Sequence, residues 1–394
     1  MKTIITNSII ITMNSDMEVF PDGYVKIEGT KILETGPSCD LKETTEELRA
    51  AGWQIKDGKR GILMPGMVNT HCHLGMIPFR GLGDDCKDRL RVFLLPMEQK
   101  AMSRRMAALS SRYAICELLL SGVTSVMDMY YFEAAVAQVM DQTGIRGIAG
   151  QTLMDEGGCD ASDADQSLSM AKELIETYRM HPRISGCAAP HATNTCSPQI
   201  LKKAWELDTA NQVPFTLHAA EMDYEMTWLA QTRGCTPVGY LDQLGVLSNQ
   251  TAAAHCIHLT DRDIEILRQR GSGVCHCIGS NAKAAKGVAP VLKLLKEGVS
   301  VGLGTDGPAS GNTLDLFAPD FRKTIAMTEV PCLQKILFPW RPVREPGFWD
   351  WKKKQVLLNL AKKQTWYWWK QILPICFLFT IPILPWFTVP MHPM

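Results

Sequence analysis

The chain has 394 residues, 46 % of them hydrophobic, and its 41 basic residues balance its 41 acidic ones, so its formal net charge is zero. This size allows one large domain, or a barrel with a small satellite domain. The balanced charge shows no tendency toward nucleic acid or anionic membranes, and we expect neither as a partner. The 13 cysteines lack paired short spacings, which favours reduced thiols in a cytoplasmic protein.

The first segment, residues 1–63, contains short β-like runs at Thr3–Met13 and Tyr24–Ile32, separated by turn residues. Its first residues alternate in polarity, as a strand does. They lack the long apolar core and small-residue cleavage site of an export signal. We therefore expect a small β-rich domain here and no secretion of the chain.

A regular alternation of strands and helices is predicted for residues 64–330. Apolar, strand-like runs alternate with helical stretches about every 30–40 residues, the size of a βα unit. One helix is predicted over Ser103–Leu120, between the first two strands. Eight such runs predict an α/β fold, a (β/α)₈ barrel of the TIM type. The runs are Ile62–Asn69, Thr124–Met129, Gly147–Leu153, Ile184–Ala189, Pro214–Leu217, Ala252–Cys256, Gly273–Cys277 and Val299–Gly304.

The first barrel strand leads into two histidines one residue apart, His71 and His73. Because side chains alternate along a strand, both imidazoles point the same way and can bind one metal ion. His218 and Asp306 lie at later strand ends, and such ends meet on one face of a barrel. Three nitrogens, one carboxylate and a position open to water favour a catalytic Zn²⁺, with Fe²⁺ and Mn²⁺ as alternatives.

Two further polar residues lie near the expected metal ligands. Glu221 follows His218 by three residues and is suited to carry a proton beside a metal-activated water. His255 is suited to hydrogen bond the attacking hydroxide and to polarise the carbon under attack. The alternative for Glu221 is a solvated surface carboxylate. Together these residues predict a hydrolytic metal site.

The motifs around these residues resemble those of the amidohydrolase superfamily. They are Pro65–His73, Leu217–Glu221, His255, Ser280–Asn281 and Gly304–Gly307. The likeness covers about residues 1–330. Within the superfamily it is to the aminohydrolase branch that includes the 5-methylthioadenosine/S-adenosylhomocysteine deaminases and the s-triazine hydrolases. No lysine follows the fourth strand, where binuclear relatives have a metal-bridging one, so the resemblance implies a single divalent ion.

The resemblance implies a hydrolase that acts on non-peptide C–N bonds, of the cyclic-amidine deaminase type. The reaction would deaminate an aminated purine nucleoside or related heterocycle: a hydroxide formed at the metal attacks the ring, and ammonia leaves. Glu221, His255 and Asp306 would stabilise the attack and move the protons. The alternative is an amino- or amidohydrolase of the guanine, pterin or s-triazine type. The expected partner is a small heterocyclic substrate, and a homo-oligomer is also open.

Three substrate contacts are implied by the same resemblance. Leu95–Glu98 is similar to the segment whose glutamate contacts ribose hydroxyls in nucleoside deaminases. Arg146 and His191 fall where that branch has substrate contacts. The alternative for Glu98 and Arg146 is a solvated surface position.

The last segment, residues 331–394, differs abruptly in composition from the rest. Seven of the ten tryptophans and nine of the 22 prolines fall there, with only Glu345 and Asp350 acidic. If the reading frame is moved one base earlier, the genetic code converts Phe348–Lys352 into Leu-Gly-Leu-Glu and Trp366–Lys370 into Val-Leu-Val-Glu. In the same frame, Leu360–Thr365 permits Gly-Lys-Lys-Ala-Asp and Pro339–Pro346 permits Met-Ala-Thr-x-x-Gly-Ala. Together these strings resemble the segment after the barrel in the same family, Met-Ala-Thr…Gly-Ala…Leu-Gly…Gly-Lys-x-Ala-Asp. We therefore infer a frameshift between about Leu314 and Gln334.

This frameshift has consequences for the N-terminal segment. In the family, the N-terminal strands complete a small β-sandwich with strands that follow the barrel. The resemblance therefore implies an incomplete β-sandwich here, with unpaired strand edges, low solubility and reduced activity. One alternative function is thus an inactive truncated product. Hydropathy alone would predict a membrane span over Ile372–Met391, but its four internal prolines argue against a regular helix.

Overall fold

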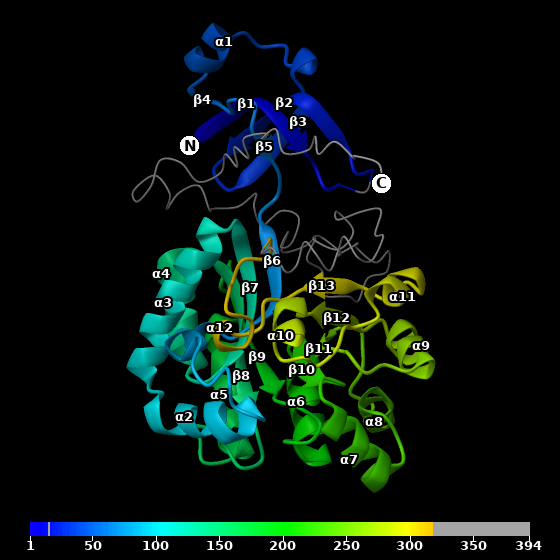
Figure 1. The fold of residues 1–394 in the computed structure, drawn as a ribbon. Helices are drawn as coiled ribbons and strands as arrows, with labels where there is room; N and C mark the ends of the chain where they lie inside the picture. The colour runs from blue at the N-terminus through cyan, green and yellow to red at the C-terminus, as the bar shows by residue number, and fades with distance from the viewer. Residues whose placement is uncertain (15, 318–394) are drawn as a thin grey trace, which may run out of the picture. The chain divides into compact units, whose positions relative to one another are not determined.

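The computed structural model describes residues 1–14 and 16–317. These residues form two compact units, one holding Met1–Gly66 and the other beginning at Met67 (Figure 1). The predicted out-of-frame segment, residues 331–394, lies outside the described residues, as do the strands expected after the barrel. The frameshift therefore stays a prediction.

The N-terminal unit is a five-stranded sheet with one short helix. The strand order is β3-β2-β1-β4, and β5 also pairs with β1. Alternate residues of β1 pack on opposite faces: Ile4 clusters with Tyr24 and Leu48, whereas Ile5 clusters with Val25. The elements are β1 (Lys2–Ile11), β2 (Val19–Glu28), β3 (Lys31–Pro37), η1 (Ser38–Asp40), α1 (Thr45–Ala50), β4 (Trp53–Asp57) and β5 (Ile62–Leu63).

The second unit contains eight parallel strands surrounded by helices (Figure 1). Parallel pairing joins β6 to β9 into one sheet of four strands and β10 to β13 into another. Their interiors are rich in buried aliphatic residues, as expected for strands covered on both faces. The strands are β6 (Met67–Cys72), β7 (Val123–Tyr130), β8 (Arg146–Leu153), β9 (Ile184–Pro190), β10 (Phe215–Ala219), β11 (Thr251–His255), β12 (Gly273–His276) and β13 (Val301–Leu303).

The two sheets meet at two seams, which close the barrel. At the seam between β6 and β13, the amide of Asp306 donates to the carbonyl of His71 at 3.1 Å. At the seam between β9 and β10, the amide of His218 donates to the carbonyl of His191 at 3.0 Å. The predicted (β/α)₈ barrel is thereby confirmed, and each seam brings two predicted site residues side by side.

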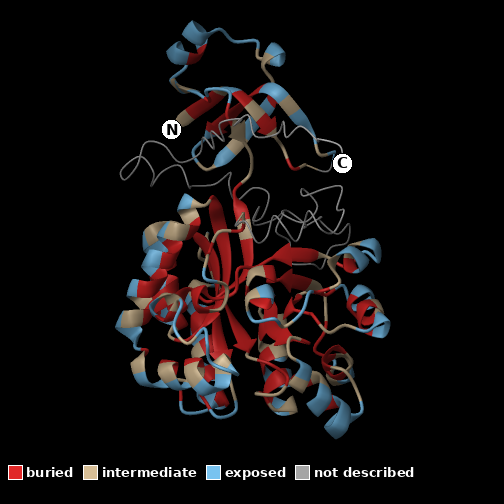
Figure 2. Cartoon of the chain, viewed as in Figure 1, coloured by how far each residue is buried: buried red, intermediate tan, exposed pale blue. Residues whose placement is uncertain are grey.

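The helices of this unit bury one face against the strands and expose the other (Figure 2). The predicted helix Ser103–Leu120 is α3 (Arg104–Leu120), capped by Ser103, whose hydroxyl oxygen accepts the amide N–H of Met106 at 3.3 Å. The others are η2 (Leu74–Phe79), η3 (Leu90–Leu94), α2 (Leu95–Ala101), α4 (Glu133–Thr143), α5 (Ala164–Tyr178), α6 (Pro198–Ala210), α7 (Asp223–Arg233), α8 (Pro237–Leu244), α9 (Asp261–Arg270), α10 (Ile278–Lys283), α11 (Val291–Lys296) and α12 (Pro308–Gly311).

One predicted strand is divided in the structure. The run Ile62–Asn69 becomes β5, which pairs with β1, and β6, which begins the barrel. Pro65 and Gly66 separate the two strands, and a proline has no N–H to donate to a strand ladder. Because the run is apolar on both sides of this point, its composition does not indicate the boundary between the two units.

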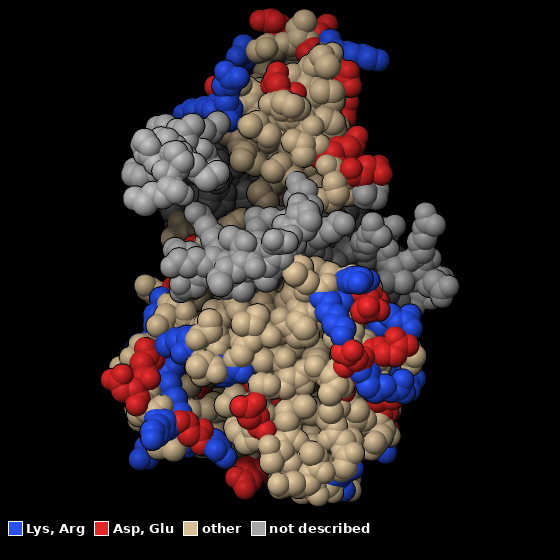
Figure 3. Space-filling view, turned by 45° about the vertical axis from the view of Figure 1, so that its right-hand side comes forward, with Lys and Arg blue, Asp and Glu red and all other residues tan. Residues whose placement is uncertain are grey.

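Charged residues of both signs lie close together on the face of the barrel unit in Figure 3, with uncharged surface between the groups. This distribution matches the zero formal net charge of the chain. Among the residues that the structure describes, no helix combines the length and the apolar character needed to cross a membrane.

Candidate metal centre and catalytic cavity

The predicted metal-site residues lie at the carboxyl ends of four barrel strands. His71 lies in β6 and His73 directly follows that strand, whereas His218 lies near the end of β10. His255 is the last residue of β11, and Asp306 follows β13. Because parallel strands end on one face of a barrel, residues up to 235 positions apart in sequence meet there.

Two of these residues have left-handed backbone conformations. The φ angles are 70° at His255 and 59° at Asp306. Such a conformation costs a residue with a side chain about 1–3 kcal/mol and persists only where neighbouring contacts maintain it. At Asp306 the seam hydrogen bond to the His71 carbonyl supplies such a contact. The side chains of His255 and Asp306 thus point in directions that a regular strand conformation would not give them.

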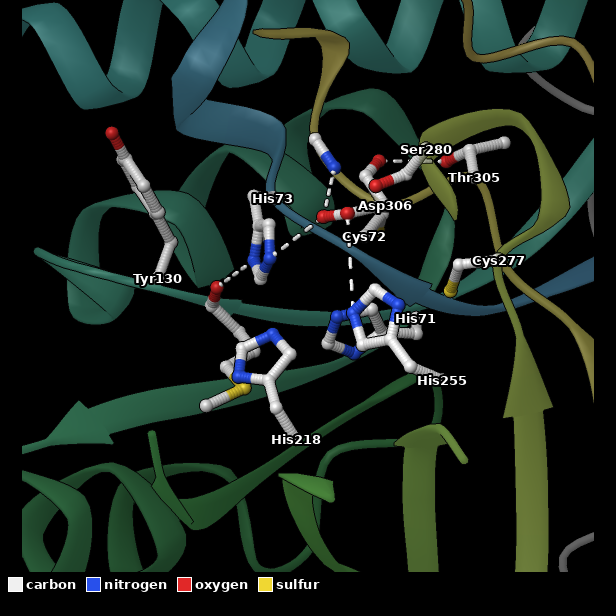
Figure 4. Close-up of polar contacts among 12 residues, drawn as sticks. His71, Cys72, His73, Tyr130, His218, His255, Cys277, Ser280, Thr305 and Asp306 are labelled. Atoms are coloured by element: carbon white, nitrogen blue, oxygen red, sulfur yellow. Dashed lines mark hydrogen bonds and ion pairs between the residues drawn. The ribbon is translucent and has the colours of Figure 1, made fainter. Parts of the chain in front are cut away.

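Three imidazoles form a compact cluster with the composition of a metal site. One ring nitrogen of each of His71, His73 and His218 lies within 4.8 Å of the others, and all three residues are buried. Oδ1 of Asp306 lies 3.0 Å from Nε2 of His73. Figure 4 shows these side chains around one space, with His255 beside them. This donor set suits a divalent ion of the Zn²⁺ type.

Hydrogen bonds orient the rings and determine which nitrogen is available. Nδ1 of His73 donates to the carbonyl of Met129, and Nδ1 of His218 donates to the carbonyl of His191 at 2.6 Å. Because a carbonyl can only accept, each Nδ1 carries a proton, and Nε2 is the nitrogen that faces the cluster. Within the described residues, the buried Nε2 of His71 has no hydrogen-bond partner. A metal ion would satisfy that orphaned atom, so the residues present fit one.

The pKa values of His71 and His218 also favour a metal site at this cluster. Burial, together with the neighbouring imidazoles, holds the pKa of His71 and that of His218 well below the usual range, so both rings are neutral. Burial also opposes the charged form of His73, but its hydrogen bond to Asp306 outweighs this and raises the pKa of His73 to about 9. Near neutral pH a proton thus lies between Nε2 of His73 and Oδ1 of Asp306. Metal binding would displace it.

Glu221 and His255 lie beside this cluster. Oε1 of Glu221 is 3.5 Å from Nε2 of His255 and 2.5 Å from Nζ of Lys286. Burial alone would raise the pKa of Glu221, but its attraction to His255 and Lys286 outweighs burial and holds that pKa well below its usual range. Nδ1 of His255 is 2.8 Å from Oδ1 of Asn281, which orients Nε2 toward the cavity. Glu221 is therefore an ionised carboxylate.

A cavity of about 370 Å³ opens over these residues. Two of the three expected substrate contacts, Glu98 and His191, line it. Glu98 is only 2 % exposed, and its Oε1 lies 2.6 Å from the hydroxyl of Tyr130. Burial raises the pKa of Glu98 to about 7. The alternative of a solvated Glu98 is therefore wrong, because the side chain is enclosed.

Arg146, the third expected contact, lies elsewhere. It is the first residue of β8, and its guanidinium donates to the carbonyl of Pro182 at 3.3 Å. The cavity opens at the other end of that eight-residue strand, roughly 23 Å away at about 3.3 Å per residue. Arg146 is buried as well, so it is neither a cavity residue nor a solvated one.

Sequence reasoning missed Lys286, which lines the cavity and contacts Glu221. Lys286 lies outside the quoted motifs, and no residue pattern marks it. Tyr130, the last residue of β7, was also missed, because only its contact with Glu98 reveals its position. Both contacts join residues more than 30 positions apart, which only the fold brings together.

Comparison with known proteins gives a consistent result. The model of the amidohydrolase family matches residues 62–333. A 5-methylthioadenosine/S-adenosylhomocysteine deaminase of Thermodesulfovibrio yellowstonii is 38 % identical over 309 residues, which are 78 % of this chain and 70 % of that protein. A 5′-deoxyadenosine deaminase of Methanococcoides burtonii is 35 % identical over 347 residues, which are 87 % of this chain and 77 % of that protein.

A solved structure is similar as well. The crystal structure of an adenosine deaminase of Xanthomonas campestris with bound zinc has a TM-score of 0.76 and 29 % identity to this chain. The alignment covers 82 % of this chain and 73 % of that one. The similarity therefore extends over most of the described part of the chain.

Proposed function

Because this chain belongs to the amidohydrolase family, whose relatives here are hydrolases of C–N bonds, we propose that it deaminates an aminated purine nucleoside or a related heterocycle. The observation that carries this proposal is the position of Glu221 beside the cluster of His71, His73 and His218. A site that activates water and a carboxylate that carries its proton are the two requirements of hydrolytic deamination.

His71, His73, His218 and Asp306 would hold the ion, which we propose to be one Zn²⁺. Zinc is bound in the similar adenosine deaminase, and Fe²⁺ and Mn²⁺ are the alternatives. When bound, the ion supplies Lewis acidity and makes hydroxide accessible near neutral pH. His71 and His218 are neutral, and the Nδ1 atoms of His73 and His218 donate to carbonyl groups, which leaves their Nε2 atoms to bind the ion. Metal binding would displace the proton that His73 shares with Asp306.

The residues around the ion would divide the proton transfers between them. Glu221 takes one proton from the attacking water and delivers it to the ring nitrogen next to the aminated carbon. Nε2 of His255, held by Asn281, hydrogen bonds the attacking oxygen. Asp306 passes the second proton to the departing amino group. The C–O bond forms and the C–N bond breaks, so the products are an oxo heterocycle and ammonia.

Glu98 and His191 would contact the substrate, since both line the cavity. Glu98 would accept hydrogen bonds from sugar hydroxyls while Tyr130 orients it. Arg146 is not part of this proposal, because it lies at the far end of β8.

The wider assignments are also proposals. We propose that residues 1–63 belong to a β-sandwich, residues 64–330 to the catalytic barrel and residues 331–394 to an out-of-frame tail. The eleven cysteines among the described residues are free thiols, which supports a reducing compartment such as the cytoplasm. A homo-oligomer stays a prediction.

An ammonia-release assay tests the function. The purified, metal-loaded chain and a frame-restored counterpart are incubated with adenosine, methylthioadenosine and adenosylhomocysteine, and then with aminated pterins and triazines. We expect metal-dependent ammonia release from a purine nucleoside. Release from triazines or pterins alone would overturn the substrate class, and no release from any compound by either metal-loaded chain would overturn the deaminase function.

A further inference from the structure

A buried lysine lies beside the carboxylate assigned to proton transfer. Nζ of Lys286 is 2.5 Å from Oε1 of Glu221 and 3.5 Å from Oγ of Ser280. The Lys286 side chain is only 14 % exposed, and it lines the cavity. Burial of an ammonium group costs free energy unless an opposite charge pairs with it, and Glu221 supplies that charge. Because Glu221 is the proposed proton carrier, Lys286 lies where a bound substrate would contact it.

The loop around Lys286 directs the side chain into the cavity. The amide of Lys286 donates to the carbonyl of Asn281 at 2.9 Å, which ties the loop to the helix that orients His255. The next residue, Gly287, has a φ of 115°, and a Cβ there would lie 2.8 Å from a side-chain carbon of Ile257. Only glycine adopts this conformation easily, so the turn that presents Lys286 is built into the loop.

Lys283, also at the cavity, is different. Its ammonium donates to Asp84 at 2.8 Å, to the carbonyl of Ala309 at 3.1 Å and to Asn312 at 2.8 Å. These three contacts use all three of its N–H donors. For Lys286, Glu221 and Ser280 account for two donors within the described residues, which leaves one donor for a ligand. Lys283 thus holds the cavity wall together, whereas Lys286 can bind a substrate.

The charge balance of the site supports such a role. Farther along the lining, Asp84 pairs with Lys283 and Arg89. Around the cluster itself, a divalent ion would be balanced by the carboxylates of Asp306 and Glu221, and the ammonium of Lys286 then adds one positive charge beside Glu221. This charge favours an acceptor oxygen or an anionic group close to Glu221.

We propose that Lys286 selects aminated rings that carry an oxo group on the carbon next to the nitrogen addressed by Glu221. This inference rests on the proposed deamination. In such a ring the nitrogen and the oxygen lie side by side on one edge, as Oε1 of Glu221 and Nζ of Lys286 do. Glu221 donates its proton to the nitrogen while Lys286 donates a hydrogen bond to the oxygen. A 2-oxo-6-aminopurine nucleoside has this edge in the tautomer that carries its ring proton on N3 and leaves N1 free to accept the proton from Glu221, whereas adenosine presents a C–H group to Lys286.

The test compares adenosine with its 2-oxo counterpart, isoguanosine, in the 394-residue chain and in its frame-restored counterpart. For each compound, kcat/KM for ammonia release and Kd by equilibrium dialysis are measured in the metal-loaded protein. A hydrogen bond from a charged donor predicts a preference of about 10- to 100-fold for isoguanosine. In Lys286→Met, which keeps the length of the side chain without its charge, the preference should disappear. In Lys286→Arg, which keeps a charged donor, part of it should return.

The matched control is Lys283→Met, which removes a lysine from the same cavity but from its wall. The isoguanosine-to-adenosine ratio should then stay within about twofold of the wild-type ratio, a change that corresponds to about 0.4 kcal/mol. Equal kcat/KM for adenosine and isoguanosine in the wild type would overturn the proposed selection by Lys286. An unchanged isoguanosine-to-adenosine ratio in Lys286→Met would overturn it as well. If neither compound releases ammonia but Kd shows the preference and its loss, the deamination fails while the role of Lys286 stands.

Discussion

Nε2 of His73 lies 3.0 Å from Oδ1 of Asp306, so one ion pair connects the first strand of the barrel with the segment after its last strand. Barrel closure and assembly of the candidate metal centre are therefore the same event in this fold. The seam hydrogen bond from the Asp306 amide to the His71 carbonyl strengthens this connection. Changes at this seam should consequently affect metal affinity and stability together.

Asp306→Asn should weaken metal binding, because it removes the carboxylate charge from the proposed ligand set. We expect the metal dissociation constant to rise by more than about 10-fold, since even partners outside the ligand set change it by about 10–100-fold. Metal analysis after dialysis against a chelator gives the measurement. Asp165→Asn, which alters an exposed ion pair with Lys203, is the matched control. Full metal retention by Asp306→Asn would contradict the assignment.

Removal of the metal should lower the stability of the chain. A ligand that binds only the folded state, present at 100 times its Kd, contributes about 2.7 kcal/mol to the free energy of unfolding. Chelation should therefore lower the melting temperature, and Zn²⁺ should restore it. His218→Ala should abolish this response. A melting curve that does not change with chelator or Zn²⁺ would argue against a metal at this cluster.

Glu221→Gln should retain the metal but lose turnover. The amide cannot take the proton of the attacking water, and general acid–base catalysis contributes about 10²–10⁴-fold to rates. We expect kcat to fall within that range while metal content stays at one ion per chain. Glu206→Gln, an exposed residue on α6, serves as the control. If Glu221→Gln turns over at the wild-type rate, another group moves the proton.

Glu98 should make stability depend on pH. Burial raises its pKa from 4.5 to about 7, so the folded state binds this proton more tightly than the unfolded state does. Its contribution is complete below pH 4.5 and is lost as pH rises through about 7. Relative to Glu98→Gln, the free energy of unfolding of the wild type should fall by about 3 kcal/mol over that interval. Denaturant titrations at several pH values measure it, and parallel curves would refute the buried, protonated Glu98.

Asn69→Ala tests the seam of the barrel directly. Asn69 is fully buried, donates to the Thr305 hydroxyl at 2.7 Å and accepts the Thr305 amide at 3.1 Å. The variant leaves that amide without its acceptor, which costs about 1–3 kcal/mol. Metal affinity should fall with it, because Thr305 precedes Asp306. Asn211→Ala removes side-chain hydrogen bonds to Arg179 and Leu207 at the end of α6 and should leave metal affinity unchanged. Unchanged metal affinity in Asn69→Ala would separate the seam from the site.

Restoring the reading frame should raise the solubility and the activity of the protein. We expect a chain shifted by one base from the region of Leu314–Gln334 onward to be more soluble and more active, because β3 and β4 end the described sheet without a further strand. The family model stops matching at residue 333, near this region. Equal soluble yield and equal turnover of both chains would contradict the frameshift.

Much of the architecture could be predicted because it is encoded locally. Apolar runs at the spacing of βα units predicted the eight barrel strands, and Ser103 marked the start of α3. The division between β5 and β6 was missed, because an apolar run does not reveal which sheet it joins. The prediction placed His71 and His73 on one face, a consequence of strand geometry alone.

Local patterns also explain which site residues could be anticipated. His71, His73, His218, Glu221, His255 and Asp306 could be proposed together because parallel strands of a closed barrel end on one face. The residue types and the expected strand order therefore pointed to the same set of site residues. The expected role of Arg146 failed on that same criterion, since it begins its strand and the cavity lies at the other end.

The order of residues was enough to specify the barrel and the chemical character of its metal centre, because both depend on short-range periodicity and residue type. It could not specify the partner of Glu221 or the protonation of Glu98. The contact with Lys286 spans 65 positions, and the raised pKa of Glu98 comes from burial, which outweighs the lowering effect of the hydrogen bond from the distant Tyr130. The short distance between Lys286 and Glu221 and the burial of Glu98 exist only in the folded chain. Tertiary structure alone therefore decided the charge next to Glu221 and the pKa of Glu98.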